Sequence, residues 1–199
     1  STLGGLVRNL TAGEMLGQIL AVNRLQGGGV GEKRAVTNVV LMGSGEPFDN
    51  YANVVRFLRN LTDADGFGMS ARNISLSTCG LVPEMRAFAQ EGIPLNLTVS
   101  LHAVTDEERM RTMPVAKAYR IRDILDACAF YFERTGRRYI FEYSLIAGEN
   151  AHLAHAAALA DLPKGRPCHV NLIRLNAVKE RSLRAADEAN AQAFLKELT

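Results

Sequence analysis

The sequence has few cysteines, no long apolar run and almost no excess of charge of either sign. Its three cysteines, Cys79, Cys128 and Cys168, are far apart and odd in number. This argues against a disulfide framework and for a reducing cytoplasm. None of them lies in a C-x-x-C pair, so no metal site is recognisable. The formal net charge of +2 neither requires nor excludes a nucleic-acid partner.

Hydrophobic segments that would direct the chain to a membrane are also missing. No run of about 18 apolar residues exists, so no membrane-spanning helix is expected. The first residues lack a basic segment followed by an apolar core, so no signal peptide is expected either. With 47% hydrophobic and 22% charged residues, the composition is that of an ordinary globular protein. We therefore expect a cytoplasmic protein.

Apolar residues recur with helix spacing and strand spacing in alternation. A capping box, Thr11-Ala12-Gly13-Glu14, opens a predicted helix over residues 11–25, and five units of strand and helix follow. Strands are expected over residues 37–42, 74–77, 95–101, 139–146 and 168–172. Such alternation is typical of an α/β protein with a parallel sheet and right-handed crossovers. Because the leading helix has an apolar face but no strand before it, we expect the chain to be cut just inside a larger barrel-like domain.

The first predicted strand ends in a glycine-rich, acidic turn. Residues 39–42 are continuously apolar, which is typical of a strand covered on both faces. Gly43 and Gly45 allow a positive φ or a close approach to a ligand, and Glu46 is held by Pro47 behind it. Parallel α/β folds bind ligands at this end of their strands. A plain turn with a solvated glutamate is the alternative.

Polar side chains also follow the later strands. Ser77 lies at the end of the second strand, Ser100 and His102 at the end of the third, and Asn176 after the fifth. Together with a carboxylate, these groups suit a zwitterionic or polyhydroxyl ligand. Ser100 and His102 stand two apart, so they should share a strand face, but no orienting acid or nucleophile turn accompanies them as a hydrolase would need. His102 could instead be a buried structural histidine.

Six segments carry a resemblance to a known family. They are Arg8-Asn9-Leu10-Thr11-Ala12-Gly13-Glu14, Met42-Gly43-Ser44-Gly45-Glu46-Pro47, Ser77-Thr78-Cys79-Gly80, Ser100-Leu101-His102-Ala103, Phe141-Glu142-Tyr143 and Pro167-Cys168-His169-Val170-Asn171-Leu172-Ile173. In order and spacing they resemble the radical S-adenosylmethionine enzymes that methylate adenine C2 in 23S rRNA and in tRNA. The resemblance implies a partial (β/α)6-type barrel, present here as five parallel strands with flanking helices.

The resemblance also implies cofactors, partners and site residues. S-adenosylmethionine would be the methyl source, a methyl-cysteine the intermediate, 23S rRNA and tRNA the substrates, and a flavodoxin or ferredoxin the electron donor of a monomeric enzyme. Gly45 and Glu46 match residues that bind the methionine amino group, and Asn176 matches an asparagine near the adenosine. Further cofactor contacts match Ser77, Ser100, Leu101 and His102. For RNA phosphate we expect contacts from the basic residues Arg8, Lys33, Arg34 and Arg72.

Parts of the family pattern have no match in this sequence. The family's C-x-x-x-C-x-x-C loop follows its first strand, and Thr2-Leu3-Gly4-Gly5 looks like the segment just beyond it. We therefore expect the ligands of the 4Fe-4S cluster to lie outside residues 1–199, together with an N-terminal RNA-binding domain and a C-terminal segment that carries the methylated cysteine. The chain is accordingly expected to be an inactive fragment of the radical S-adenosylmethionine core domain, without catalytic or metal-binding residues of its own.

Three other interpretations remain open. The related adenine C8 methyltransferases share much of the pattern. A non-catalytic RNA-binding barrel would also fit the composition and the alternation. An ordinary phosphate-binding barrel enzyme should have a glycine-rich loop at a late strand, and nothing after Leu172 fits. Two departures from the family pattern are Ala151, where an aspartate often follows the asparagine, and Arg174, where proline is common.

Overall fold

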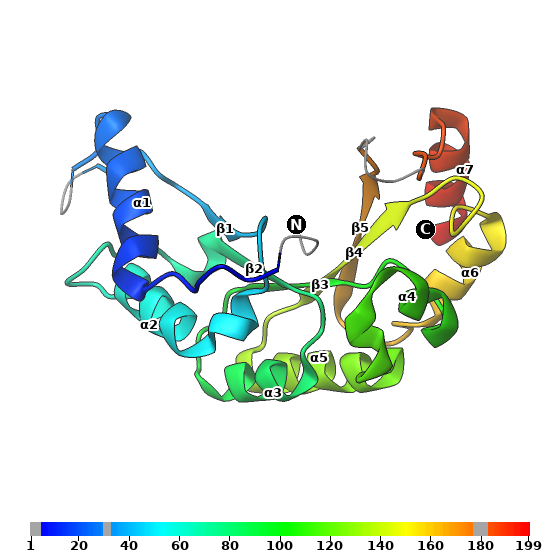
Figure 1. The fold of residues 1–199 in the computed structure, drawn as a ribbon, viewed down its shortest axis with the longest axis horizontal. Helices are drawn as coiled ribbons and strands as arrows, with labels where there is room; N and C mark the ends of the chain where they lie inside the picture. Colours follow the sequence, from blue (N-terminus) through cyan, green and yellow to red (C-terminus); the bar gives the residue numbers. More distant parts are fainter. Residues whose placement is uncertain (1–4, 30–32, 177–182) are drawn as a thin grey trace. The chain divides into compact units, whose positions relative to one another are not determined.

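The computed structural model describes residues 5–29, 33–176 and 183–199. Its strands form one sheet in the order β1-β2-β3-β4-β5 (Figure 1). They are β1 (Val39–Leu41), β2 (Ile74–Thr78), β3 (Asn96–Ser100), β4 (Tyr139–Leu145) and β5 (Cys168–Arg174). The predicted α/β class, with five parallel strands and flanking helices, is confirmed.

Helices separate the strands along the chain. They are α1 (Ala12–Leu25), α2 (Tyr51–Thr62), α3 (Val82–Gln90), α4 (Asp106–Thr112), α5 (Ile121–Thr135), α6 (Leu153–Asp161) and α7 (Glu188–Leu198), with short 3-10 turns η2 (Pro47–Asn50), η3 (Ala71–Asn73) and η4 (Pro114–Lys117). Among the described residues, none of these helices combines the length and the apolarity that crossing a membrane requires. Thr2, Leu3 and Gly4, which were compared with a family segment above, lie outside the described residues.

The chain divides into two compact units. The first comprises Ser1–Thr78, Pro83–Leu97 and Phe130–Arg137, and the second comprises Cys79–Val82, Thr98–Ala129 and Arg138–Thr199. The chain therefore passes from one unit to the other at five points, after residues 78, 82, 97, 129 and 137.

In the first unit, the start of α1 is fixed by its predicted capping box. The Thr11 hydroxyl accepts a hydrogen bond from the Glu14 amide at 3.2 Å, and the Glu14 carboxylate accepts one from the Thr11 amide at 2.8 Å. Arg8 donates to the same carboxylate and lowers the pKa of Glu14 to about 2. Helix α1 contacts α2, which lies at the lower end of α1 in Figure 1.

Strand β1 is shorter and more open than predicted. It pairs in parallel with β2, with Val39 opposite Ile74. Val39 is buried, but 60% of Val40 and 51% of Met42 are exposed. The expectation that both faces of this strand are covered is therefore wrong. Successive side chains of a strand point to opposite faces, and the described residues cover only the face of Val39.

An aromatic series forms part of the first unit's core. The rings of Phe48 and Phe88 are 5.5 Å apart, and Phe88 stacks on Tyr131 at 6.2 Å. All three side chains are buried. The Tyr131 hydroxyl donates to the Leu95 carbonyl at 2.9 Å, so this buried polar group keeps a hydrogen-bond partner.

In the second unit, β4 pairs in parallel with both β3 and β5. Ser100 of β3 lies opposite Glu142, and Tyr139 lies opposite Cys168 at the start of β5. Helices α6 and α7 lie side by side in Figure 1 and contact each other. Tyr143 from β4 stacks on Phe194 from α7 with ring centroids 5.7 Å apart, which fastens α7 to the sheet.

Candidate cofactor site

The turn after β1 has the left-handed backbone that its glycines permit. Gly43 and Gly45 have φ angles of 126° and 90°. A Cβ at either position would meet nothing within 4 Å, so the backbone angle, and not a lack of space, requires glycine there. Glu46 then caps η2, and its carboxylate accepts a hydrogen bond from the Phe48 amide at 3.1 Å. Because Phe48 is buried, this bond ties Glu46 to the core of the first unit.

Ser77 lies on the less buried face of β2. Ile74, Leu76 and Thr78 are buried, whereas the alternate residues Ser75 and Ser77 are half-buried. Since β1 and β2 are parallel, the turn after β1 and the end of β2 lie at the same edge of the first unit. The structure therefore brings Glu46 and Ser77 to a common edge, as the sequence predicts.

In the second unit the chain turns sharply after Ser100. The amides of Leu101 and His102 both donate to the Glu142 carbonyl, at 3.0 and 3.3 Å. His102 has a φ of 57°, and among the described residues it is the one non-glycine with a positive φ. The prediction that Ser100 and His102 share a strand face is therefore wrong, because β3 ends at Ser100 and the backbone at His102 is left-handed.

The imidazole of His102 is held in one protonation state. Its Nδ1 accepts a hydrogen bond from the Ser144 amide at 3.1 Å, so the neutral ring carries its proton on Nε2. Burial, and then the charge of Arg109, lower the pKa of His102 to about 4. The ring can thus donate from Nε2 at neutral pH. It is not set up as a base for Ser100, which does not favour a nucleophilic pair.

Two buried polar residues that the sequence did not single out hold this turn. Asn150 donates through Nδ2 to the His102 carbonyl at 2.9 Å and to the Ser144 carbonyl at 2.8 Å. Its Oδ1 accepts from the Ile146 amide at 2.8 Å. Arg109 is completely buried and donates to the carbonyls of the turn. An asparagine after a glycine turn and an arginine on a short charged helix give no sequence signal of burial.

Asn176 lies just beyond the carboxyl end of β5 and is exposed. Two residues earlier, Arg174 pairs with Glu188 at 3.1 Å. None of the contacts found for the described residues joins Asn176 to Ser100 or His102. The assignment of Asn176 to the cofactor therefore rests on the resemblance.

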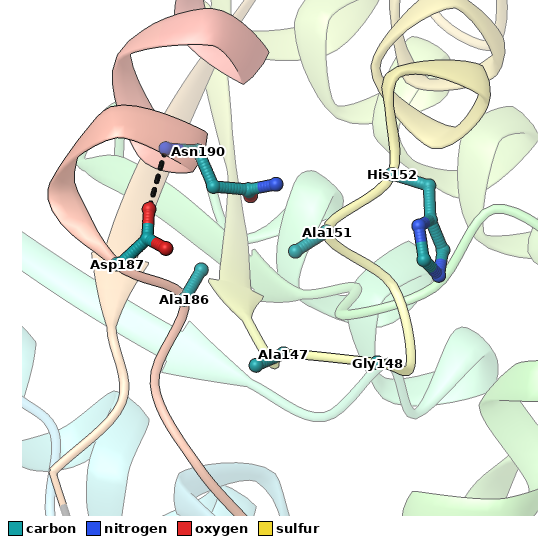
Figure 2. A pocket seen from close by; sticks show the side chains of 7 residues that line it. All are labelled: Ala147, Gly148, Ala151, His152, Ala186, Asp187 and Asn190. Carbon is teal, nitrogen blue, oxygen red and sulfur yellow. Dashed lines mark hydrogen bonds between the residues drawn. The ribbon is translucent and has the colours of Figure 1, made fainter.

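A small pocket lies in the second unit, where the N-terminal ends of α6 and α7 come together (Figure 2). Its volume is about 100 Å³. A cofactor of nucleoside size needs at least roughly 300 Å³, so this pocket is not the cofactor site. The Asn190 side chain points into it, and its Oδ1 has no hydrogen-bond partner among the described residues. The lining residues are Ala147, Gly148, Ala151, His152, Ala186, Asp187 and Asn190.

The four predicted RNA-binding residues differ in their surroundings. Arg8 pairs with Glu14 at 2.7 Å. Arg34 donates to the Gly68 carbonyl and lies 5.8 Å from the centre of the Phe67 ring. Lys33 and Arg72 are exposed. The first two charges thus already have partners within the first unit.

The described residues do not fit an iron–sulfur cluster. No group of three histidine, cysteine, aspartate or glutamate side chains that could hold a metal occurs in this part of the chain. Cys128 is completely buried, and burial raises the pKa of its thiol. A buried, protonated thiol is not a metal ligand.

Comparison with known proteins gives a consistent result. No protein-family model matches the chain. A probable dual-specificity RNA methyltransferase of Lachnoclostridium phytofermentans is 50% identical over 194 residues, which cover 98% of this chain and 53% of that protein. One from Clostridium perfringens is 49% identical over 199 residues, covering all of this chain and 55% of that protein.

Solved structures agree with the sequence comparison. A radical SAM methyltransferase from Sphaerobacter thermophilus matches with a TM-score of 0.91 and 41% identity, over 98% of this chain and 57% of that one. A domain of the pyruvate-formate lyase-activating enzyme from Bacteroides vulgatus matches with a TM-score of 0.62 and 16% identity, which concerns the fold alone. The chain spans about half the length of the curated relatives it matches. The predicted resemblance is confirmed: the chain is related along its whole length to part of the dual-specificity RNA methyltransferases of the radical SAM class.

Proposed function

We propose that the protein containing this chain transfers a methyl group from S-adenosylmethionine to C2 of adenine in 23S rRNA and tRNA, and that this chain holds the cofactor. The observation that carries the proposal is about 50% identity, over nearly the whole chain, to proteins named dual-specificity RNA methyltransferases. The match to a radical SAM methyltransferase structure supports the choice of cofactor. The chain would be a core-domain fragment of that protein.

Each unit, taken by itself, offers donor and acceptor groups of the kind that bind such a cofactor. In the first unit, the Glu46 carboxylate can accept from the methionine ammonium, and the Ser77 hydroxyl can donate or accept. In the second unit, His102 offers a neutral Nε2–H donor, and the turn at Ser100 and Leu101 offers backbone groups. S-adenosylmethionine supplies the methyl group when bound. The residues of this chain bind and orient it, and none of them is assigned a covalent role.

Glu46→Gln tests the binding assignment in the protein that contains this chain. The change keeps the shape of the side chain but removes the charge that an ammonium group would pair with. We expect S-adenosylmethionine affinity, measured by calorimetry, to fall roughly tenfold or more. Glu91→Gln is the matched control, because Glu91 is a carboxylate of the same unit whose partners are Tyr51 and Arg59. Unchanged affinity in Glu46→Gln would rule out the assignment.

Contacts to RNA phosphate form a second part of the proposal. Lys33 and Arg72 are the stronger candidates, because Arg8 and Arg34 are already engaged by Glu14 and by backbone carbonyls. Replacing Lys33 and Arg72 with alanine should weaken RNA binding and reduce the salt slope by roughly one for each lost phosphate contact. Lys164→Ala, which removes an exposed charge paired with Asp161, is the control. An unchanged slope would identify these residues as ordinary surface charge.

The position of methylation distinguishes the C2 proposal from the C8 alternative. Mass spectrometry of digested 23S rRNA from cells with and without the gene should show 2-methyladenosine lost in the deletion strain. Loss of 8-methyladenosine instead would establish the alternative. A methyl-cysteine intermediate is also part of the proposal, and Cys79, Cys128 and Cys168 are not assigned to it.

A further inference from the structure

Arg109 is a buried cation that forms no ion pair with a carboxylate of the described residues. The side chain comes from α4 and is completely buried. No carboxylate forms an ion pair with it in the described part of the chain, since the nearby Glu108 contacts His155 instead. Burial lowers the pKa of the guanidinium. Burying a charge is unfavourable unless it is compensated, so the local structure must supply the compensation.

Backbone carbonyls at the ends of two strands provide that compensation for Nη2 and Nε, whereas Nη1 has no hydrogen-bond partner among the described residues. Nη2 donates to the Cys79 carbonyl at 2.5 Å and to the Ser100 carbonyl at 3.2 Å, and Nε donates to the Leu101 carbonyl at 3.3 Å. Cys79 follows the last residue of β2, and Ser100 is the last residue of β3. A planar guanidinium with donors in a fixed fork can bind such a group of carbonyls, whereas an apolar residue would remove these hydrogen bonds.

The local packing brings the guanidinium close to the backbone. A Cβ on Gly80 would lie 3.3 Å from Arg109 Nη2 and 2.8 Å from the Ile124 side chain. Glycine at this position therefore leaves the room in which Arg109 reaches the Cys79 carbonyl. Gly80 also has a φ of 97°, which a side chain rarely tolerates.

The segment that Arg109 holds would otherwise be unfavourable. The left-handed conformation of His102 is uncommon for a residue with a side chain and persists only where its surroundings determine it. Arg109 binds the carbonyls of the two residues before His102, and Asn150 binds the carbonyl of His102 itself. Buried side chains of the protein therefore hold the conformation of this turn.

We propose that Arg109 is a positioning residue for the S-adenosylmethionine site, because it fixes the backbone of Ser100, Leu101 and His102 in the conformation that receives the cofactor. The inference rests on the proposed function for the identity of the ligand. It adds a residue that does not touch the ligand and acts through the backbone of the turn.

Arg109→Met in the protein that contains this chain is the test. Methionine is similar in length and avoids a buried charge, so the variant should fold. We expect the KM for S-adenosylmethionine to rise roughly tenfold or more while the KM for RNA stays within twofold, since several hydrogen bonds from a charged donor are lost. Amide hydrogen exchange at Leu101 and His102 should accelerate by a similar factor. Arg109→Lys, which keeps the charge but not the fork, should fall between wild type and Arg109→Met.

Arg166→Met is the matched control. This arginine also donates to a backbone carbonyl, that of Leu125 at 2.7 Å, but it precedes β5 at the amino end of the strands of the same unit. It should change thermal stability without changing the KM for S-adenosylmethionine or the exchange at Leu101 and His102. An equal effect of both substitutions would show that Arg109 acts only through general stability.

The remaining outcomes also decide the question. Wild-type KM and exchange in a folded Arg109→Met variant would overturn the proposal. If that variant does not fold, Arg109→Lys is judged by the same criterion, and failure of both to fold would establish a purely structural role. If the wild-type protein does not bind S-adenosylmethionine, the proposed function fails. The exchange measurement, which needs no ligand, still tests whether Arg109 fixes the turn.

Discussion

His102 shows how one residue can be fixed in both backbone and charge. The Ser144 amide occupies its Nδ1, and burial keeps the ring neutral with a pKa of about 4. A sequence shows that a histidine follows a strand, but not which ring nitrogen is occupied. This tautomer is set by a backbone amide more than forty positions away along the chain.

The protonation of His102 should make stability depend on pH. The pKa of His102 falls from 6.5 to about 4 on folding, so between these values the unfolded chain binds the proton more tightly. The contribution to stability is complete above about pH 6.5 and is lost as the pH falls toward 4. Free energies of unfolding measured by urea titration at pH 7 and pH 5 should show this decline.

Two variants separate this effect from other titrations. His102→Asn keeps a residue that tolerates the left-handed backbone and should remove the decline. His152→Asn, at an exposed histidine of the same unit, should retain it. A pH dependence that survives in His102→Asn would assign the decline to other groups.

Asn150 should be among the least replaceable polar residues of the second unit. Asn150→Ala would leave the Ile146 amide and the carbonyls of His102 and Ser144 without their partner, at a cost of about 3 kcal/mol in the free energy of unfolding. Asn190→Ala is the control, because Asn190 Oδ1 has no partner in the described structure, and should cost less than about 1 kcal/mol. If chemical denaturation showed the same loss in the free energy of unfolding for Asn150→Ala and Asn190→Ala, this account would be contradicted.

At the scale of single elements, the start of α1 is the best test of a local sequence signal. Thr11→Ala should destabilise the first unit by about 1 kcal/mol, because it removes the hydroxyl that accepts from the Glu14 amide. Thr37→Ala, at an exposed position outside any helix or strand, is the control and should change the free energy of unfolding little. If the free energy of unfolding fell in Thr37→Ala but not in Thr11→Ala, the capping box would not be what stabilises α1.

Elements whose ends depend on hydrogen bonds between residues close in sequence were predicted well. Elements that depend on contacts with other parts of the fold were not. The capping box fixed the start of α1 to within one residue, because its hydrogen bonds are between residues close in sequence. Strand β1 was predicted as covered on both faces, yet Val40 is exposed. An apolar run shows that burying these side chains is favourable. It does not show which part of the protein covers each face of the strand. The end of β3 depends on the Glu142 carbonyl of another strand, and the sequence carries no sign of that bond.

At the scale of the whole molecule, the alternation of strands and helices was sufficient to predict the parallel sheet and to place Glu46, Ser77, Ser100 and His102 at strand ends. The residues that hold the turn at His102 could not be predicted in the same way. Arg109 belongs to a short helix rich in charged residues, and such a pattern is typical of a solvated surface. Its burial follows from the convergence of three carbonyls, which only the folded chain brings together.

The 199-residue chain alone should not assemble an iron–sulfur cluster. The described residues offer no group of three metal-binding side chains. Incubation of the chain with iron and sulfide under anaerobic conditions, followed by gel filtration, should leave no visible absorption and no bound iron. A protein that joins this chain to the proposed cluster ligands should retain both under the same conditions. Bound iron in the 199-residue chain would show that ligands have been overlooked.

The division of the chain into two units has a consequence for its synthesis. The first unit includes Phe130–Arg137, and the second reaches from Cys79 to Thr199. As the polypeptide emerges from the ribosome, the first unit cannot be complete until residue 137 has left the exit tunnel. By then part of the second unit is already outside, while β4, β5, α6 and α7 are still to be translated. The first unit can therefore be completed only after part of the second has been synthesised, and a premature stop before residue 130 would leave both incomplete.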